Sequence, residues 1–189
     1  MQHIIYLHGF LSSPKSVKAQ QTLAFFKAHF PAVNIHIPQL PGDIGRAITQ
    51  IESLVNTLPQ KQLRFIGSSM GGFLSTYFVE QYGGKAVLVN PAVEPFNLLK
   101  HYMGKHLNPY TGEIFYITYN QIERLVQAHQ TALRKPEDYF VLLQTGDETL
   151  DYRLAEKKYQ HSKMYIEDGG NHSFVDYDKH LPDIFSFLR

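Results

Sequence analysis

The stretch that most constrains this chain lies near its middle, where a short apolar run meets a glycine-rich turn and then a helical pattern, residues 63–78. The turn places Gly67, Ser69 and Gly71 in the spacing G-x-S-x-G. A serine at the tip of a tight strand-to-helix turn takes strained backbone angles, and side chains two residues before and after it would collide. Because glycine suits both places, the pattern predicts a nucleophile elbow with Ser69 at its tip.

Ser68 is the neighbouring alternative for the nucleophile. Glycine lies both two residues before and two residues after Ser69, and Ser68 lacks this spacing. We therefore expect Ser68 to pack or to hydrogen-bond at the end of the strand. The helix that follows Ser69 also has free N–H groups in its first turn, and these favour a developing negative charge nearby.

Apolar runs and turn residues predict strands and helices along the whole chain. Continuous apolar runs indicate buried strands, and an alternating run indicates an edge strand. The expected strands are 4–7, 33–37, 63–68, 86–89, 139–143 and 163–166. The expected helices are about 14–29, 44–58, 70–82 and 151–159, with a last helix after Pro182.

Strands that alternate with helices predict a parallel sheet covered on both faces, which is a three-layer α/β fold with about six strands. A length of 189 residues suits one domain, so we expect residues 1–189 to share one core. Residues 94–136 interrupt the alternation, are rich in aromatic side chains and are too long for a simple crossover helix. We interpret them as a cap-like, helical insertion over the edge that carries the site.

Four groups that are far apart in the sequence follow directly after predicted strands. They are the His8-Gly9 turn, Ser69, Asp147 and His172. In parallel sheets, ligands collect at the carboxyl ends of the strands. We therefore expect these groups to share one rim of the sheet.

A serine hydroxyl needs a base, because it is almost never ionised near neutral pH. His172 follows the last strand in a Gly-Gly-Asn loop, and the other nine histidines lie near element ends or in the insertion. Asp147 comes first after its strand, and a carboxylate beside an imidazole fixes its tautomer. Glu148, Asp151 and Asp168 are the alternatives for this acid, and each is less well placed.

The negative charge that forms on a carbonyl oxygen during attack requires two N–H groups aimed at it. Met70 follows the nucleophile and supplies one of them. Phe10 lies in the turn after the first strand, on the same rim, and is placed to supply the other. We predict that these two amides form the oxyanion hole.

Composition excludes several other classes of function. The formal net charge is +1 without a basic run, so nothing indicates a nucleic-acid partner. The chain has no cysteine, no H-E-x-x-H metal motif and no glycine-rich phosphate or dinucleotide fingerprint, so we expect no metal and no cofactor. No apolar run approaches the length of a membrane span, and no signal sequence is evident. A cytoplasmic protein is the expectation, and the oligomeric state stays open.

Several motifs together resemble the α/β-hydrolase superfamily, whose catalytic order is Ser, Asp, His. They are residues 6–10, 67–72, 146–148 and 169–172. Within it, the segments 7–14 and 67–72 resemble the small bacterial YqiA-like esterases, and the match runs from about residue 3 to the C-terminus. The resemblance implies a serine esterase with the triad Ser69, Asp147 and His172. It also implies Phe10 and Met70 as oxyanion donors.

These observations predict an enzyme that hydrolyses a carboxylic ester or thioester of a small or acyl-chain substrate through an acyl-enzyme. The aromatic side chains of residues 94–136 favour an apolar acyl pocket. Two alternatives stay open. The same triad could cleave amides or lactones or transfer an acyl group, or the chain could be a ligand-binding protein on a hydrolase scaffold that has lost turnover.

Overall fold

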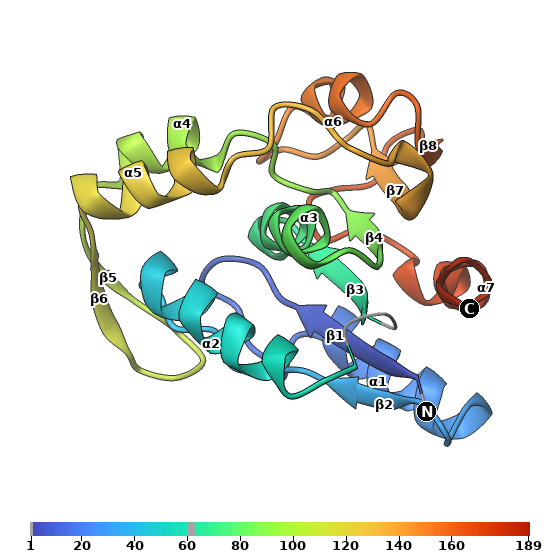
Figure 1. Cartoon of the computed structure of the whole chain (residues 1–189). Helices are drawn as coiled ribbons and strands as arrows, with labels where there is room; N and C mark the ends of the chain where they lie inside the picture. The colour runs from blue at the N-terminus through green and yellow to red at the C-terminus, as the bar shows by residue number, and fades with distance from the viewer. Residues whose placement is uncertain (1, 60–62) are drawn as a thin grey trace.

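The centre of the protein is a parallel β-sheet, seen in a computed structural model that describes residues 2–59 and 63–189 (Figure 1). Within these residues the sheet has six strands in the order β2-β1-β3-β4-β7-β8, and every neighbouring pair is parallel. The strands are β1 (His3–Leu7), β2 (Asn34–His36), β3 (Leu63–Ser68), β4 (Lys85–Val89), β7 (Tyr139–Gln144) and β8 (Lys163–Glu167). The predicted three-layer α/β fold is confirmed.

Helices cover both faces of the sheet because successive residues of each strand point to opposite sides. One buried cluster joins the sheet to α2, α3 and α6, and a second joins it to α1 and α7. The helices are α1 (Val17–His29), α2 (Ile44–Asn56), α3 (Met70–Tyr82), α4 (Pro95–Leu99), α5 (Tyr119–Ala128), α6 (Tyr152–Lys158) and α7 (Leu181–Leu188). Among the described residues, no helix is long and apolar enough to cross a membrane.

Helix α1 differs from its prediction in both its start and its buried face. It begins at Val17 rather than near residue 14, and Val17 is 73% exposed although it belongs to the apolar spacing that predicted the helix. The face that packs on the sheet carries Ala19, Thr22 and Phe26. Thr22 is buried because its hydroxyl is hydrogen-bonded to the Tyr177 hydroxyl at 2.9 Å. A polar residue therefore lies at the centre of the packed face.

The insertion at residues 94–136 contains a β-hairpin as well as the helices α4 and α5. The antiparallel strands β5 (Gly104–Leu107) and β6 (Ile114–Ile117) form the hairpin, which curves past α2 at one side of the molecule (Figure 1). On β6, Phe115 and Ile117 point inward while Ile114 and Tyr116 are exposed. All four residues are apolar or aromatic, so the alternation typical of such a strand is hidden, and no strand was predicted there.

Candidate active site

Ser69 occupies the junction of β3 and α3 with a backbone of φ 55° and ψ −119°. This conformation is rare for a residue with a side chain and is found where the surrounding structure enforces it. A Cβ atom on Gly67 would overlap the carbonyl oxygen of Gly71, and a Cβ atom on Gly71 would overlap that of Leu7. Both glycines are therefore required for β1, β3 and α3 to approach so closely around the serine.

Ser69, His172 and Asp147 form a continuous chain of hydrogen-bonding distances. The Ser69 Oγ lies 3.1 Å from Nε2 of His172. Nδ1 of the same ring lies 2.8 Å and 3.0 Å from the two carboxylate oxygens of Asp147. With the Nδ1 proton donated to Asp147, the lone pair of Nε2 faces the serine hydroxyl. The structure thus brings together the three residues predicted as the triad, from the ends of three different strands.

The Asp147 carboxylate is enclosed and well supplied with hydrogen-bond donors. Its side chain is 2% exposed, against 23% for that of His172. Its Oδ1 accepts the backbone N–H groups of Thr149 and Leu150, both at 2.8 Å. Burial acts to raise the pKa of Asp147, but the bonds from His172 and from these two amides outweigh it and hold the pKa below its ordinary value. The group therefore stays ionised beside the imidazole.

The loop that carries His172 is held in place by two buried polar residues that were not predicted. Asn90 follows β4, and its Nδ2 donates to the carbonyl groups of Asn171 and His172 at 3.0 and 3.3 Å. Its Oδ1 accepts the backbone N–H of Gln144 at 3.0 Å. The signal in the sequence is a polar side chain at the end of a buried apolar run.

Gln144, the last residue of β7, makes four hydrogen bonds through its side-chain amide. Oε1 accepts the N–H groups of Asn171 and Val175, and Nε2 donates to Glu167 and to the Val175 carbonyl. Gly170 permits this approach, because a Cβ atom there would overlap Oε1. Gly170 also takes a φ of 71°, a left-handed conformation that favours glycine. The glycines before His172 thus fix a particular turn rather than making the loop free.

Glu148, considered above as an alternative to Asp147 for the acid, contacts a different part of His172. Its Oε2 accepts the backbone N–H of His172 at 3.0 Å. This bond, together with further backbone hydrogen bonding, lowers the pKa of Glu148. The carboxylate therefore contacts the backbone of the proposed base, while Asp147 contacts its ring.

Replacing Gln144 with leucine is expected to reduce kcat for the predicted ester hydrolysis by about tenfold or more, because the unpaired Asn171 and Val175 amides would move the His172 loop. Glu148→Ala is the matched control, since it removes one exposed hydrogen bond from the same loop and should cost less than about tenfold. Steady-state kinetics and a denaturation curve on each variant test this order. Equal kcat values for Gln144→Leu and the parent protein would contradict it.

The turn after β1 packs directly against the serine. A Cβ atom on Gly9 would lie 3.3 Å from the Cβ of Ser69, so this turn and Ser69 are in contact. Phe10 lies next in this turn and shares a cavity with Ser69. Met70 is the first residue of α3, where helix amides have no intrahelical acceptor. The role of Phe10 and Met70 as oxyanion donors stays a prediction.

The His8 side chain is hydrogen-bonded both to this turn and to the loop after β2. Its Nδ1 lies 2.9 Å from the Gly9 carbonyl oxygen, and its Nε2 accepts the backbone N–H of Leu40 at 3.1 Å. Burial lowers the pKa of His8, although its bond to Gly9 opposes the shift. A neutral His8 can serve both partners at once, donating through Nδ1 and accepting through Nε2. It therefore ties the loop after β1 to the loop after β2.

The cavity around Ser69 and His172 has a volume of about 460 Å³ and is lined by both polar and apolar residues, mostly from the loops after β1 and β8 and from the start of α1. Of residues 94–136, Tyr110 is the one that lines it. Tyr102, Tyr116 and Tyr119 lie exposed on the surface, and Phe115 packs edge-on against Phe10 with ring centroids 5.6 Å apart. The aromatic side chains of the insertion therefore do not gather into the apolar acyl pocket that was predicted.

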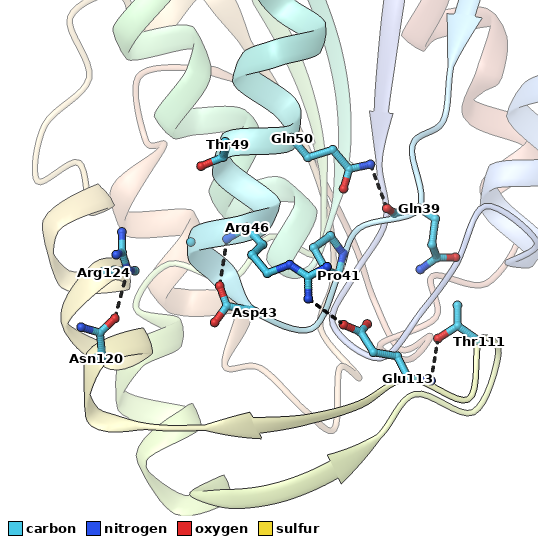
Figure 2. Close-up of a pocket in the computed structure, with 11 residues that line it drawn as sticks. Gln39, Pro41, Asp43, Arg46, Thr49, Gln50, Thr111, Glu113, Asn120 and Arg124 are labelled. Carbon is cyan, nitrogen blue, oxygen red and sulfur yellow. Dashed lines mark hydrogen bonds and ion pairs between the residues drawn. The ribbon is translucent and has the colours of Figure 1, made fainter.

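A second cavity of about 750 Å³ lies between α2 and the β5–β6 hairpin, and Ser69, Asp147 and His172 are not among its lining residues (Figure 2). Its charged side chains have polar partners among the residues that line it. Arg46 lies 3.7 Å from Glu113, and Arg124 donates to Asn120 at 3.0 Å. Across the described ranges 2–59 and 63–189, no group of three or more histidine, aspartate or glutamate side chains is arranged to hold a metal ion.

The parallel sheet, the strained serine between β3 and α3 and the chain order Ser, Asp, His define a member of the α/β-hydrolase superfamily. The chain belongs to the uncharacterised protein family UPF0227, a YqiA-like family whose model matches residues 3–189. Both the predicted superfamily and the extent of the match, from about residue 3 to the C-terminus, are confirmed.

Solved structures of similar fold carry several different names. Est1E from Butyrivibrio proteoclasticus, with ferulic acid bound, has a TM-score of 0.74 at 13% identity, covering 100% of this chain and 88% of Est1E. A variant of tomato methylketone synthase I has a TM-score of 0.73 at 8% identity, covering 100% and 97%. Mouse alpha/beta hydrolase domain-containing protein 10 has a TM-score of 0.71 at 16% identity, covering 99% and 90%. At these identities the similarity establishes the fold.

Proposed function

We propose that this protein is a serine hydrolase that cleaves carboxylic esters or thioesters of small or acyl-chain substrates through an acyl-enzyme. The observation that carries the proposal is the chain of contacts from Ser69 Oγ through His172 to the buried Asp147 carboxylate. An imidazole placed in this way can take the serine proton while the carboxylate stabilises the imidazolium that results.

The proposed reaction has two halves. In the first, Nε2 of His172 accepts the proton of Ser69 as Oγ bonds to the substrate carbonyl carbon, and the imidazolium then protonates the departing alkoxide or thiolate. In the second, His172 takes a proton from water as the hydroxide attacks the acyl-serine. Returning that proton to Oγ releases the carboxylic acid and restores the serine. The backbone N–H groups of Phe10 and Met70 stabilise the negative oxygen in both halves.

The other chemistries of the same triad remain alternatives within this proposal. Amide or lactone cleavage and acyl transfer use the same acyl-enzyme and differ in the leaving group or in the acceptor. The insertion at residues 94–136 is proposed as a cap-like element, since the loop of its hairpin contributes Tyr110 to the wall of the cavity. A panel of ester, thioester, amide and lactone substrates separates these reactions.

Covalent labelling with a fluorophosphonate probe tests the nucleophile. The parent protein is expected to gain one phosphonyl group, found by mass spectrometry on the peptide that contains Ser69. Ser69→Ala should abolish both labelling and hydrolysis of an aryl ester, in protein purified away from host esterases. Ser68→Ala is the matched control and should label normally, because His172 faces Ser69. Labelling that persists in Ser69→Ala would refute the proposed nucleophile.

A further inference from the structure

Lys18 brings a positive charge to the cavity that holds Ser69 and His172. It lies in the first turn of α1, is half-buried and lines that cavity. Its Nζ donates one hydrogen bond, to the carbonyl oxygen of Ser173 at 2.8 Å. An ammonium group has three N–H donors, so two remain for a ligand. Neither the catalytic proposal nor the sequence motifs assign this lysine a role.

No carboxylate in the described parts of the chain neutralises this lysine, since their ion pairs do not include Lys18. Two aspartates lie nearby, and each has another partner: Asp147 contacts His172, and Asp176, which also lines the cavity, contacts Lys179 at 2.6 Å. Burial lowers the pKa of Lys18 to about 8, although the charge of Asp147 opposes the shift. The group therefore remains cationic at neutral pH, in a place where a cation without a counter-ion is unfavourable.

The start of α1 adds to the attraction for an anion. Ser16 and Val17 line the cavity beside Lys18, and the first turn of this 13-residue helix contains no acidic residue. The Ser16 side chain makes no capping hydrogen bond, so it does not occupy the free amides of that turn. Free amides and the helix dipole favour a negative group at a helix N-terminus, where they act in the same direction as the lysine.

We propose that Lys18 and the first turn of α1 bind a carboxylate or phosphate group of the substrate, whose ester or thioester carbonyl lies at Ser69. The proposal rests on the proposed hydrolase function and narrows it, because it makes anionic esters the preferred substrates. Polar side chains such as Ser12, Gln21 and Asn171 share the cavity wall with Lys18, and of the insertion's aromatic side chains Tyr110 is the one that lines it, which agrees with such a substrate.

The other role that the contacts allow is a structural support. The bond from Lys18 to Ser173 could simply steady the loop next to His172. The two roles differ in a measurable way. If Lys18 only supports the loop, its loss should change kcat for every substrate equally. If Lys18 binds an anion, its loss should change KM for charged substrates and leave the KM of neutral substrates nearly unaffected.

Two matched pairs of nitrophenyl esters separate these roles. In the first pair the acyl chain ends in a carboxylate or in its methyl ester, and in the second the nitrophenol carries the carboxylate or its methyl ester. In one of the pairs we expect kcat/KM to favour the charged ester by about tenfold or more, mainly through KM. Inorganic phosphate, tested as a competitive inhibitor of a neutral ester, tells a phosphate site from a carboxylate site.

Substitutions at the lysine complete the test. Lys18→Met should bring the ratio of kcat/KM between the charged and the neutral ester to about one, and it should remove inhibition by phosphate. Lys18→Arg should retain most of the preference and most of the inhibition. Lys15→Met is the control, because Lys15 is an exposed lysine of the loop just before α1 and lies outside the cavity lining. No preference in either pair together with no inhibition by phosphate overturns the proposal, as does a preference that survives Lys18→Met.

Binding to an inactive protein keeps this test independent of turnover. Calorimetric titration of the Ser69→Ala variant with each charged and neutral ester measures the same preference without hydrolysis. If the chain hydrolyses no ester but this variant binds the charged esters in a Lys18-dependent way, the hydrolase proposal fails and the anion site stands. If esters are hydrolysed without any charge preference and phosphate does not inhibit, the anion site fails alone.

Discussion

Replacing His172 with alanine is expected to lower kcat for ester hydrolysis by about 10⁴-fold or more, with little change in KM. The imidazole is the group within reach of the serine proton, at 3.1 Å from Oγ, and without it the hydroxyl must attack un-ionised. Asp147→Asn should produce a loss of similar order, because an amide cannot hold the ring in the tautomer that accepts this proton. Steady-state kinetics on an aryl ester measures both losses.

His161→Ala is the control for this experiment, because His161 is exposed at the end of a different loop. Its kcat should match that of the parent protein. A His172→Ala variant that folds normally, shown by an unchanged denaturation midpoint, and yet retains activity within about tenfold of the parent would show that His172 is not the base.

Gly71→Ala is expected to destabilise the protein by about 3 kcal/mol or more, or to prevent folding. The added methyl group would overlap the carbonyl oxygen of Leu7 and lie 2.8 Å from that of His8. Both neighbours are backbone atoms at the end of β1, which is held in the sheet by β2 and β3. Relief therefore requires α3 to move away from β1, and Ser69 moves with it. Chemical denaturation measures the change in the free energy of unfolding.

Gly45→Ala is the matched control, also a glycine in the first turn of a helix. Its added Cβ atom would lie 3.0 Å from Nε of Arg124, an exposed and flexible side chain that can move aside. The free energy of unfolding should change by less than about 1 kcal/mol. If Gly71→Ala were as stable as Gly45→Ala, the close packing of β1 against α3 would not be required.

The fold and the proposed triad could be predicted because both depend on patterns that are local in the sequence. Strands covered on both faces are continuous apolar runs, and the strained turn at Ser69 needs glycine at two defined positions. A parallel sheet then brings the residues after its strands to one rim without further information. Asp147 and His172 could be placed next to Ser69 for that reason alone.

The parts that could not be predicted depend on partners distant in sequence. Thr22 lies on the buried face of α1 because its hydroxyl is hydrogen-bonded to that of Tyr177, which is far along the chain. In the sequence, Asn90 and Gln144 are polar residues at strand ends like any other. Their role is evident only in the folded protein, where they are hydrogen-bonded to the His172 loop. The aromatic residues of the insertion indicated an apolar pocket, but their spacing carries no information on which side of the hairpin each one faces.

The hydrogen bonds from Asn90 and Gln144 to the His172 loop also bear on the order in which the chain is synthesised. Residues that hold the loop belong to the ends of β4 and β7, which leave the ribosome well before residue 172 does. Ser69 and the residues that hold this loop are therefore synthesised before the proposed base, His172. Until the His172 loop packs on Asn90 and Gln144, Ser69 lacks the base proposed for it, so the proposed reactivity requires the part of the chain that follows β8.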